Sequence, residues 1–191
     1  MTDEPIERDS TDAGQVTVLI VEDEEHLADM YAAYLSDEYE TVLAYGGEPA
    51  LEMLRERSFD LVLLDRRMPV VSGNEVLAKI EEAGLNCRVA MVTAVNPDFD
   101  IIDLRIDDYL VKPVTGGELR ETVSRLLKLD EYNDRMQQLT SKKLKRNVLQ
   151  VEKTTSELVE SPDFQELTEA IEALEAEVDS LADELELGEE H

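Results

Sequence analysis

Residues 59–65 read Phe59-Asp-Leu-Val-Leu-Leu-Asp65, a short apolar run that ends on an acid. The run is too short for a buried helix and is rich in aliphatic residues, which is typical of an interior strand of a parallel sheet. A second such run, Val16-Thr-Val-Leu-Ile-Val21, is followed by Glu22 and Asp23. Because the carboxyl ends of parallel strands border one crevice, the acids after the two runs are predicted to come together.

The alternation of strand and helix continues beyond these two runs. Further strands are expected at 39–45, 89–92 and 109–111, and helices at 24–37, 48–57, 75–83 and 118–129. Five alternations of this kind predict an α/β fold, with a flavodoxin-like, doubly wound, five-stranded parallel sheet covered by helices on both faces. The segment that Pro97 opens is ambiguous.

The pattern changes at about Asp130, after which no strand is expected. A first helix spaces Leu144, Val148, Val151 and Leu158 at multiples of three, four and seven residues. Ser161 and Pro162 are suited to cap and open a second helix, in which apolar residues from Leu167 to Leu185 recur with a 4-3-4-3-4 spacing. Such a seam demands a partner helix, either in the same chain as a hairpin or in a second copy as a homodimer.

Three parts of the chain are therefore expected. Residues 1–14 are predicted to be a flexible acidic tail, residues 15–129 the α/β domain, and residues 130–187 an α-helical hairpin or coiled-coil domain.

The composition narrows the function. The 191 residues hold 46 acids and 18 basic residues, for a net charge of −28, so a basic footprint over the whole chain for nucleic acid is excluded. Acids spread along the chain suggest adaptation to a salt-rich cytosol, where screening removes most of the self-repulsion. No run approaches a membrane span, and the N-terminus does not resemble a signal peptide, so a cytoplasmic protein is expected. One cysteine, Cys87, and two histidines, His26 and His191, leave no Cys/His metal cluster.

Chemically informative residues follow several of the predicted strands, namely Glu22, Asp23, Asp65, Thr93 and Lys112. Clustered carboxylates repel one another unless a cation neutralises them, and hard oxygen ligands with room for water suit Mg²⁺. Together with Lys112, such an ion would stabilise negative charge on a phosphoryl group near Asp65, to which Thr93 could donate a hydrogen bond.

The motifs that carry these residues resemble the receiver domain of two-component response regulators. They are Val-Leu-Ile-Val-Glu22-Asp23-Glu, Asp60-Leu-Val-Leu-Leu-Asp65-Arg-Arg-Met-Pro69 with Gly73, Thr93-Ala94, and Asp107-Asp108-Tyr109-Leu-Val-Lys112-Pro113. The resemblance implies that Asp65 is the phosphoacceptor for a sensor histidine kinase. It implies a signalling protein that is not an enzyme, apart from autocatalytic phosphorylation and dephosphorylation.

The same resemblance assigns roles around Asp65. Asp23, Asp65 and the backbone carbonyl of Arg67 would bind Mg²⁺ directly, and Glu22 would act through a water. Lys112 would pair with the phosphoryl group, and Pro113 would follow a cis peptide bond. Thr93 would be the switch hydroxyl, and Tyr109 the switch aromatic residue.

Two features set limits on this reading. The chain between Thr93 and Lys112 is shorter than is usual in the family, so the fourth helix is expected to be short or irregular, which puts the usual dimer face in doubt. A phosphatase of the haloacid-dehalogenase type would also use an aspartyl nucleophile and Mg²⁺, but it needs a second Asp where this chain has Arg67.

The tail contains a local basic segment, with Arg135, Lys142, Lys143, Lys145 and Arg146 in a stretch without acids. One hypothesis is a DNA-binding transcription regulator that uses this patch on phosphates, and the other is an internal match to the acidic residues 157–190. The receiver followed by a basic and then an acidic helix resembles haloarchaeal regulators that carry a HalX domain. Their resemblance implies output through the helical domain, by protein contact or dimerisation.

Overall fold

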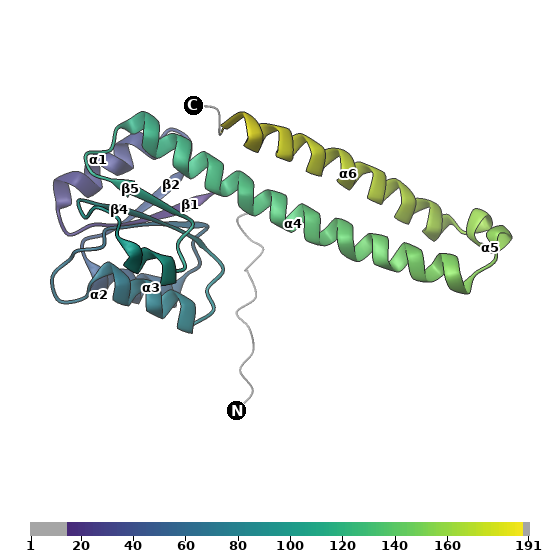
Figure 1. Ribbon diagram of the computed structural model, residues 1–191, viewed down its shortest axis with the longest axis horizontal. Coiled ribbons are helices and arrows are strands. Elements are labelled where there is room, and N and C mark those ends of the chain that lie inside the picture. Colours follow the sequence, from purple (N-terminus) through teal and green to yellow (C-terminus); the bar gives the residue numbers. More distant parts are fainter. Residues whose placement is uncertain (1–14, 189–191) are drawn as a thin grey trace. The chain divides into compact units, whose positions relative to one another are not determined.

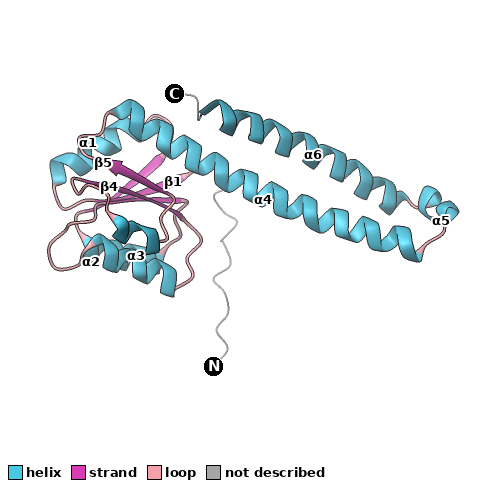
Figure 2. Ribbon diagram, viewed as in Figure 1, coloured by secondary structure: helices cyan, strands magenta, loops and turns pink. Residues whose placement is uncertain are grey.

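Five short strands form one parallel sheet with the order β2-β1-β3-β4-β5 (Figures 1 and 2). The strands of this computed structural model are β1 (Thr17–Val21), β2 (Glu40–Ala44), β3 (Leu61–Leu64), β4 (Arg88–Thr93) and β5 (Asp108–Val111). The order reverses between β1 and β3, as in a doubly wound sheet, so the predicted fold is confirmed. The structure describes residues 15–188, with side chains up to Leu185, and the predicted tail at 1–14 lies outside the described residues.

Helices cover both faces of the sheet because its strands are apolar on both sides. The helices of this part are α1 (Glu25–Leu35), α2 (Gly47–Glu56), α3 (Gly73–Glu82) and the start of α4 (Gly116–Glu152). Leu19 and Val21 lie in one core cluster with Leu54 of α2 and Val76 of α3. Figure 1 shows α1 and the start of α4 on the opposite face.

A single 3₁₀ turn, η1 (Phe99–Asp103), stands between β4 and β5 in place of a full helix. The Asp98 carboxylate caps it by accepting a hydrogen bond from the Phe99 amide at 2.7 Å. The expectation of a short or irregular fourth helix is therefore confirmed.

The fifth helix of the α/β part does not end where the sequence analysis placed it. A helix over 118–129 was expected to be separate from the tail, but α4 runs without a break from Gly116 to Glu152. The reason lies in the sequence, because neither glycine nor proline occurs between 118 and 152. Contacts nevertheless divide the chain into two units between Leu126 and Leu127, inside this helix.

The second unit is a hairpin in which α6 (Pro162–Gly188) packs against α4. Its apolar cluster comprises Leu139, Ile171, Leu174 and Val178, with Tyr132, Met136 and Leu167 against them. The seam of α6 thus has a partner helix within the chain. Ser161 caps α6, with its hydroxyl accepting a hydrogen bond from the Phe164 amide at 3.3 Å, as predicted.

The first tail helix differs from the prediction in its end and in its packing face. It stops at Glu152, and a capping box between Thr154 and Glu157 starts a separate helix, α5 (Thr155–Glu160), which contains Leu158. The hairpin packs through Tyr132, Met136 and Leu139, while the stripe expected from the spacing of Leu144 and Val148 is exposed. Among the described helices, none has the length and apolar character that crossing a bilayer requires.

Gly73 sets the path of the loop between β3 and α3, and this yields a first prediction. A Cβ atom at this position would lie 2.1 Å from the Asp65 carbonyl oxygen, so Gly73→Ala must push the backbone after Asp65 aside. We expect the free energy of unfolding to fall by about 1–3 kcal/mol, measured by urea denaturation in molar KCl.

The matched control is Gly117→Ala in the first turn of α4, where the nearest atom to a new Cβ is the Thr115 hydroxyl oxygen at 3.9 Å. We expect this variant to be neutral or slightly more stable, because alanine favours helix. Equal losses in the two variants would contradict the close approach at Gly73.

Candidate functional site

Two acids that follow neighbouring strands form the floor of the site. Val21 of β1 pairs with Leu64 of β3, so Glu22 and Asp65 leave the sheet side by side. Both side chains are buried, while Asp23 is the most accessible of the three acids. A ligand oxygen from each of Glu22, Asp23 and Asp65 lies within 4.8 Å of the others. The predicted convergence of these acids at one edge of the sheet is what the structure shows.

Lys112, which follows β5, joins the two buried carboxylates. Its Nζ lies 2.6 Å from Oε2 of Glu22 and 2.8 Å from Oδ2 of Asp65, and only 12% of its side chain is exposed. The Lys112 amide donates to the Thr93 carbonyl at 2.9 Å, and the Lys112–Pro113 peptide bond is cis. One ammonium thus compensates two carboxylates that water hardly reaches.

Burial and the bridging hydrogen bonds together set the pKa values of Glu22 and Lys112. Burial raises the pKa of Glu22, although the Lys112 ammonium counteracts part of that rise. Burial alone would lower the pKa of Lys112, but hydrogen bonds to Asp65 and Glu22 outweigh it, and the pKa is raised. Lys112 is therefore a firmly charged cation at neutral pH.

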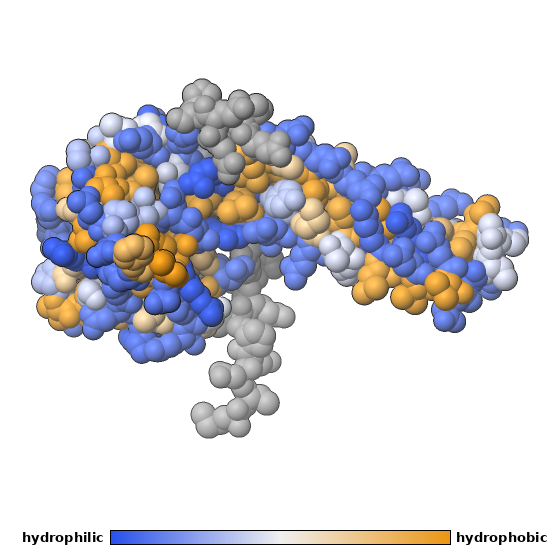
Figure 3. Space-filling model, viewed as in Figure 1, coloured by the Kyte–Doolittle hydropathy of each residue, from blue (hydrophilic) through white to orange (hydrophobic). Residues whose placement is uncertain are grey.

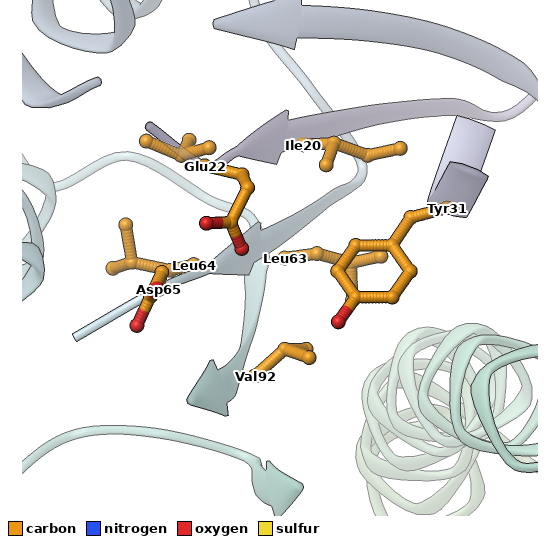
Figure 4. A pocket seen from close by; sticks show the side chains of 8 residues that line it. Ile20, Glu22, Tyr31, Leu63, Leu64, Asp65 and Val92 are labelled. Atoms are coloured by element: carbon orange, nitrogen blue, oxygen red, sulfur yellow. The ribbon is translucent and has the colours of Figure 1, made fainter. Parts of the chain in front are cut away.

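A small pocket next to the acids is lined in part by a tyrosine (Figure 4). Its lining residues include Ile20, Glu22, Leu63, Asp65 and Val92, and Tyr31 of α1 turns its hydroxyl toward them. Tyr31 is 2% exposed, and burial raises the pKa of its hydroxyl, so it stays protonated. The sequence gives no sign of this neighbour, because Tyr31 lies in a helix that is separated in the chain from Asp65.

The two residues expected to switch both contact Val95, just after β4. The buried Thr93 hydroxyl oxygen accepts a hydrogen bond from the Val95 amide at 3.3 Å. The Tyr109 hydroxyl donates to the Val95 carbonyl at 2.8 Å. The segment that leaves β4 is therefore held from two sides.

Arg66, directly after Asp65, was missed as a site residue. Its guanidinium forms an ion pair with Asp100 of η1 and also interacts with Tyr109. The spacing of residues could not have predicted the ion pair between Arg66 and Asp100, because the segment around η1 has no regular pattern of apolar residues. The loop that carries Asp65 is thereby tied to the segment after β4.

The donor set around Asp65 fits a hard divalent cation. Three carboxylates converge, and the accessible Asp23 leaves room for water ligands, which Mg²⁺ retains in protein sites. The Arg67 amide donates to Oδ1 of Asp65 at 3.1 Å, so the backbone at Arg67 is close to the same carboxylate.

The basic segment of the tail is partly neutralised inside the hairpin. Arg135 pairs with Glu177 at 3.0 Å and Lys143 with Glu175 at 2.7 Å, both on α6. The pKa of Glu175 is lowered by its hydrogen bond to Lys143, with smaller help from the charge of Arg146. Within the described part of the chain, Lys142 and Lys145 form no ion pair.

Comparison with known proteins identifies two domain families and several similar proteins. The family described as the response regulator receiver domain matches residues 18–124, and the HalX domain matches residues 128–191. A Haloferax volcanii protein named as a transcriptional regulator is 53% identical over 116 residues, which is 60% of this chain and 20% of that protein.

Two further relatives come from bacteria. The transcriptional regulatory protein CutR of Streptomyces coelicolor is 42% identical over 113 residues, 57% of this chain and 52% of CutR. The chain thus spans from a fifth to about half of the length of these curated relatives. The crystal structure of the response regulator TrrA from Thermotoga maritima, in complex with Mg²⁺-BeF, has a TM-score of 0.54 and 32% identity, over 59% of this chain and 99% of TrrA.

The buried Lys112 bridge generates a second prediction. In Lys112→Met, two buried carboxylates lose their cation, so the free energy of unfolding should fall by about 3–5 kcal/mol in EDTA. Millimolar Mg²⁺ should restore part of this loss, because a cation that binds the folded carboxylates stabilises the folded state. Urea denaturation with and without Mg²⁺ measures both effects.

Lys79→Met is the matched control, because Lys79 pairs with Glu82 on the surface of α3. It should cost less than about 1 kcal/mol and respond little to Mg²⁺. A Lys112 variant that behaved like this control would show that the bridge contributes nothing special.

Proposed function

The chain belongs to the response regulator receiver domain family, with a HalX domain after the receiver, and on this premise we propose that it is a phosphorylation switch with Asp65 as the phosphoacceptor. It is thus a two-component response regulator, and its partner in the proposal is a sensor histidine kinase in the cytoplasm. The observation that carries the proposal is the buried Asp65 carboxylate, bridged to Glu22 by Lys112 at the carboxyl edge of the sheet.

The proposed reaction is transfer of one phosphoryl group. An Asp65 carboxylate oxygen attacks the phosphorus of a phosphohistidine, a new P–O bond forms, and the P–N bond breaks. Its electron pair stays on the imidazole nitrogen, which takes up a proton. In this proposal Lys112 pairs with the transferred phosphoryl group, since its ammonium already lies 2.8 Å from Asp65.

Magnesium is the cofactor in this proposal. Glu22, Asp23, Asp65 and the backbone carbonyl of Arg67 would hold it, and the ion would neutralise charge on the phosphoryl oxygens. The chain turns over no external substrate in this account, and its chemistry is limited to its own phosphorylation and dephosphorylation.

The signal leaves the site through the segment after β4. A phosphoryl group on Asp65 offers acceptors to the Thr93 hydroxyl, which would then release the Val95 amide that it now accepts from. Tyr109 would reorient with the same segment, because its hydroxyl donates to the Val95 carbonyl. Phosphorylation would thereby shift an equilibrium between two arrangements that already exist.

For the output we favour protein contact or dimerisation through the helical hairpin. The alternative, DNA binding by residues 135–146, gains support from the relatives' names but not from the ion pairs. Arg135 and Lys143 are held by Glu177 and Glu175, so the basic segment presents fewer free charges than its sequence suggests. DNA affinity rests on such free charges.

A third prediction tests the phosphoacceptor. Incubation with Mg²⁺ and acetyl phosphate should add one base-labile phosphoryl group to the intact chain, detected by mass spectrometry. Asp65→Asn should lose this addition, because an amide oxygen is not a nucleophile of the required strength. Asp37→Asn, a change of the same kind on an exposed turn, should keep it. A phosphoryl group that persisted in Asp65→Asn would refute the assignment.

A fourth prediction separates the two roles of the basic segment. Changing both Arg135 and Lys143 to Gln should lower the free energy of unfolding by about 0.2–1 kcal/mol per ion pair, while Lys142→Gln should have little effect. Duplex DNA binding, measured by fluorescence anisotropy in the same salt, should be undetectable for the unchanged protein. Tight binding that Lys142→Gln weakens would favour the DNA-binding alternative instead.

A further inference from the structure

Three apolar side chains form an exposed stripe near the end of α4. Leu144 is 65% exposed, Val148 54% and Val151 83%, whereas Leu139, which packs against α6, is 5% exposed. The spacing of four and three residues places the stripe on one side of the helix, and Leu144 lies about 140° around the axis from Leu139. Figure 3 shows hydrophobic residues at the surface of this end of the hairpin. The stripe thus faces away from the hairpin core.

Two opposite charges border the stripe on a single flank. Lys145 and Glu152 are seven residues apart, so they occupy the same position of a heptad. They stand three residues before and four residues after Val148, and neither forms an ion pair within the described residues. On the other flank, Asn147 carries no charge.

We propose that this stripe binds the same stripe of a second copy of the chain, with the two α4 helices antiparallel and crossing near Val148. The proposal deepens the dimerisation output of the proposed function, on which it rests, by naming the surface, the partner and the direction. In an antiparallel pair, equivalent heptad flanks face each other. A twofold axis near Val148 therefore sets Lys145 of each copy opposite Glu152 of the other copy, and the apolar residues meet across the axis.

The charge pattern selects a second copy over other partners. A uniformly acidic partner would match Lys145 but would meet Glu152 as a like charge. Nucleic acid would meet Glu152 in the same way and would leave the apolar stripe without a match. A parallel pair of α4 helices would set Lys145 against uncharged residues of the opposite flank, so of these arrangements only the antiparallel copy satisfies both charges.

The seam is short, with three apolar residues from each copy, so the dimer should be weak and concentration-dependent, as small transient interfaces are. Sedimentation equilibrium of the full chain in molar KCl should show a mass that rises from monomer to dimer with concentration. Val148→Asp should abolish the dimer, because it buries two like charges at the axis.

A charge exchange tests the direction. Lys145→Glu and Glu152→Lys should each weaken the dimer by roughly fivefold or more, since each sets like charges opposite each other twice. The double variant should return to within about twofold of the unchanged protein. Lys142→Glu is the matched control, because it makes the same charge change about 160° around the helix from Leu144 and should have no effect.

Three outcomes would overturn the proposal. They are a chain that stays monomeric at every concentration, a dimer that Val148→Asp leaves intact, and single charge variants that the double variant does not rescue. The acetyl phosphate assay on the same variants keeps this test apart from the proposed function. If the chain stays monomeric and Asp65 still takes up a phosphoryl group, the dimer proposal is refuted and the phosphoacceptor assignment stands.

Discussion

The Lys112 ammonium holds the buried Glu22 and Asp65 carboxylates together at the carboxyl edge of the sheet, with Nζ–O distances of 2.6 and 2.8 Å. Three strands must end in register for this contact to form, since β1, β3 and β5 each deliver one of the charges. Buried charges that water does not reach are tolerated only when charges of opposite sign compensate them. The contact therefore joins the carboxyl ends of β1, β3 and β5 at the place of the proposed chemistry, where Thr93 and Tyr109 also form hydrogen bonds to Val95.

The sequence was sufficient for the sheet and for most of the site. Apolar runs that end on acids predicted strands whose carboxyl ends meet, and Glu22, Asp65 and Lys112 do meet. It was insufficient for contacts made by segments without a period. The ion pair of Arg66 with Asp100 depends on the path of a 3₁₀ turn, and the approach of Tyr31 to the acids depends on how α1 packs. Neither path is encoded in spacing alone.

The tail shows a different limit of sequence patterns. The regular spacing of α6 correctly predicted a partner helix. However, α6 does not pack against the apolar stripe of Leu144, Val148 and Val151 on α4. Helix α4 has two apolar faces, and periodicity cannot rank them. The ion pairs of Arg135 and Lys143 with Glu177 and Glu175 favour the face that α6 covers, which leaves Leu144, Val148 and Val151 for another surface. Although the chain as a whole is strongly acidic, basic residues of α4 thus pair with acidic residues of α6.

The central claim is that Asp65, flanked by Glu22, Asp23 and Lys112, is the place where a phosphoryl group is held. Fluorine NMR with Mg²⁺ and beryllofluoride, a mimic of the phosphoryl group, measures this directly on the unmodified chain. The account predicts a bound fluoride signal that requires Mg²⁺ and is lost in Asp65→Asn but kept in Asp37→Asn. A bound signal that survives in Asp65→Asn, or no bound signal at saturating Mg²⁺, would contradict it.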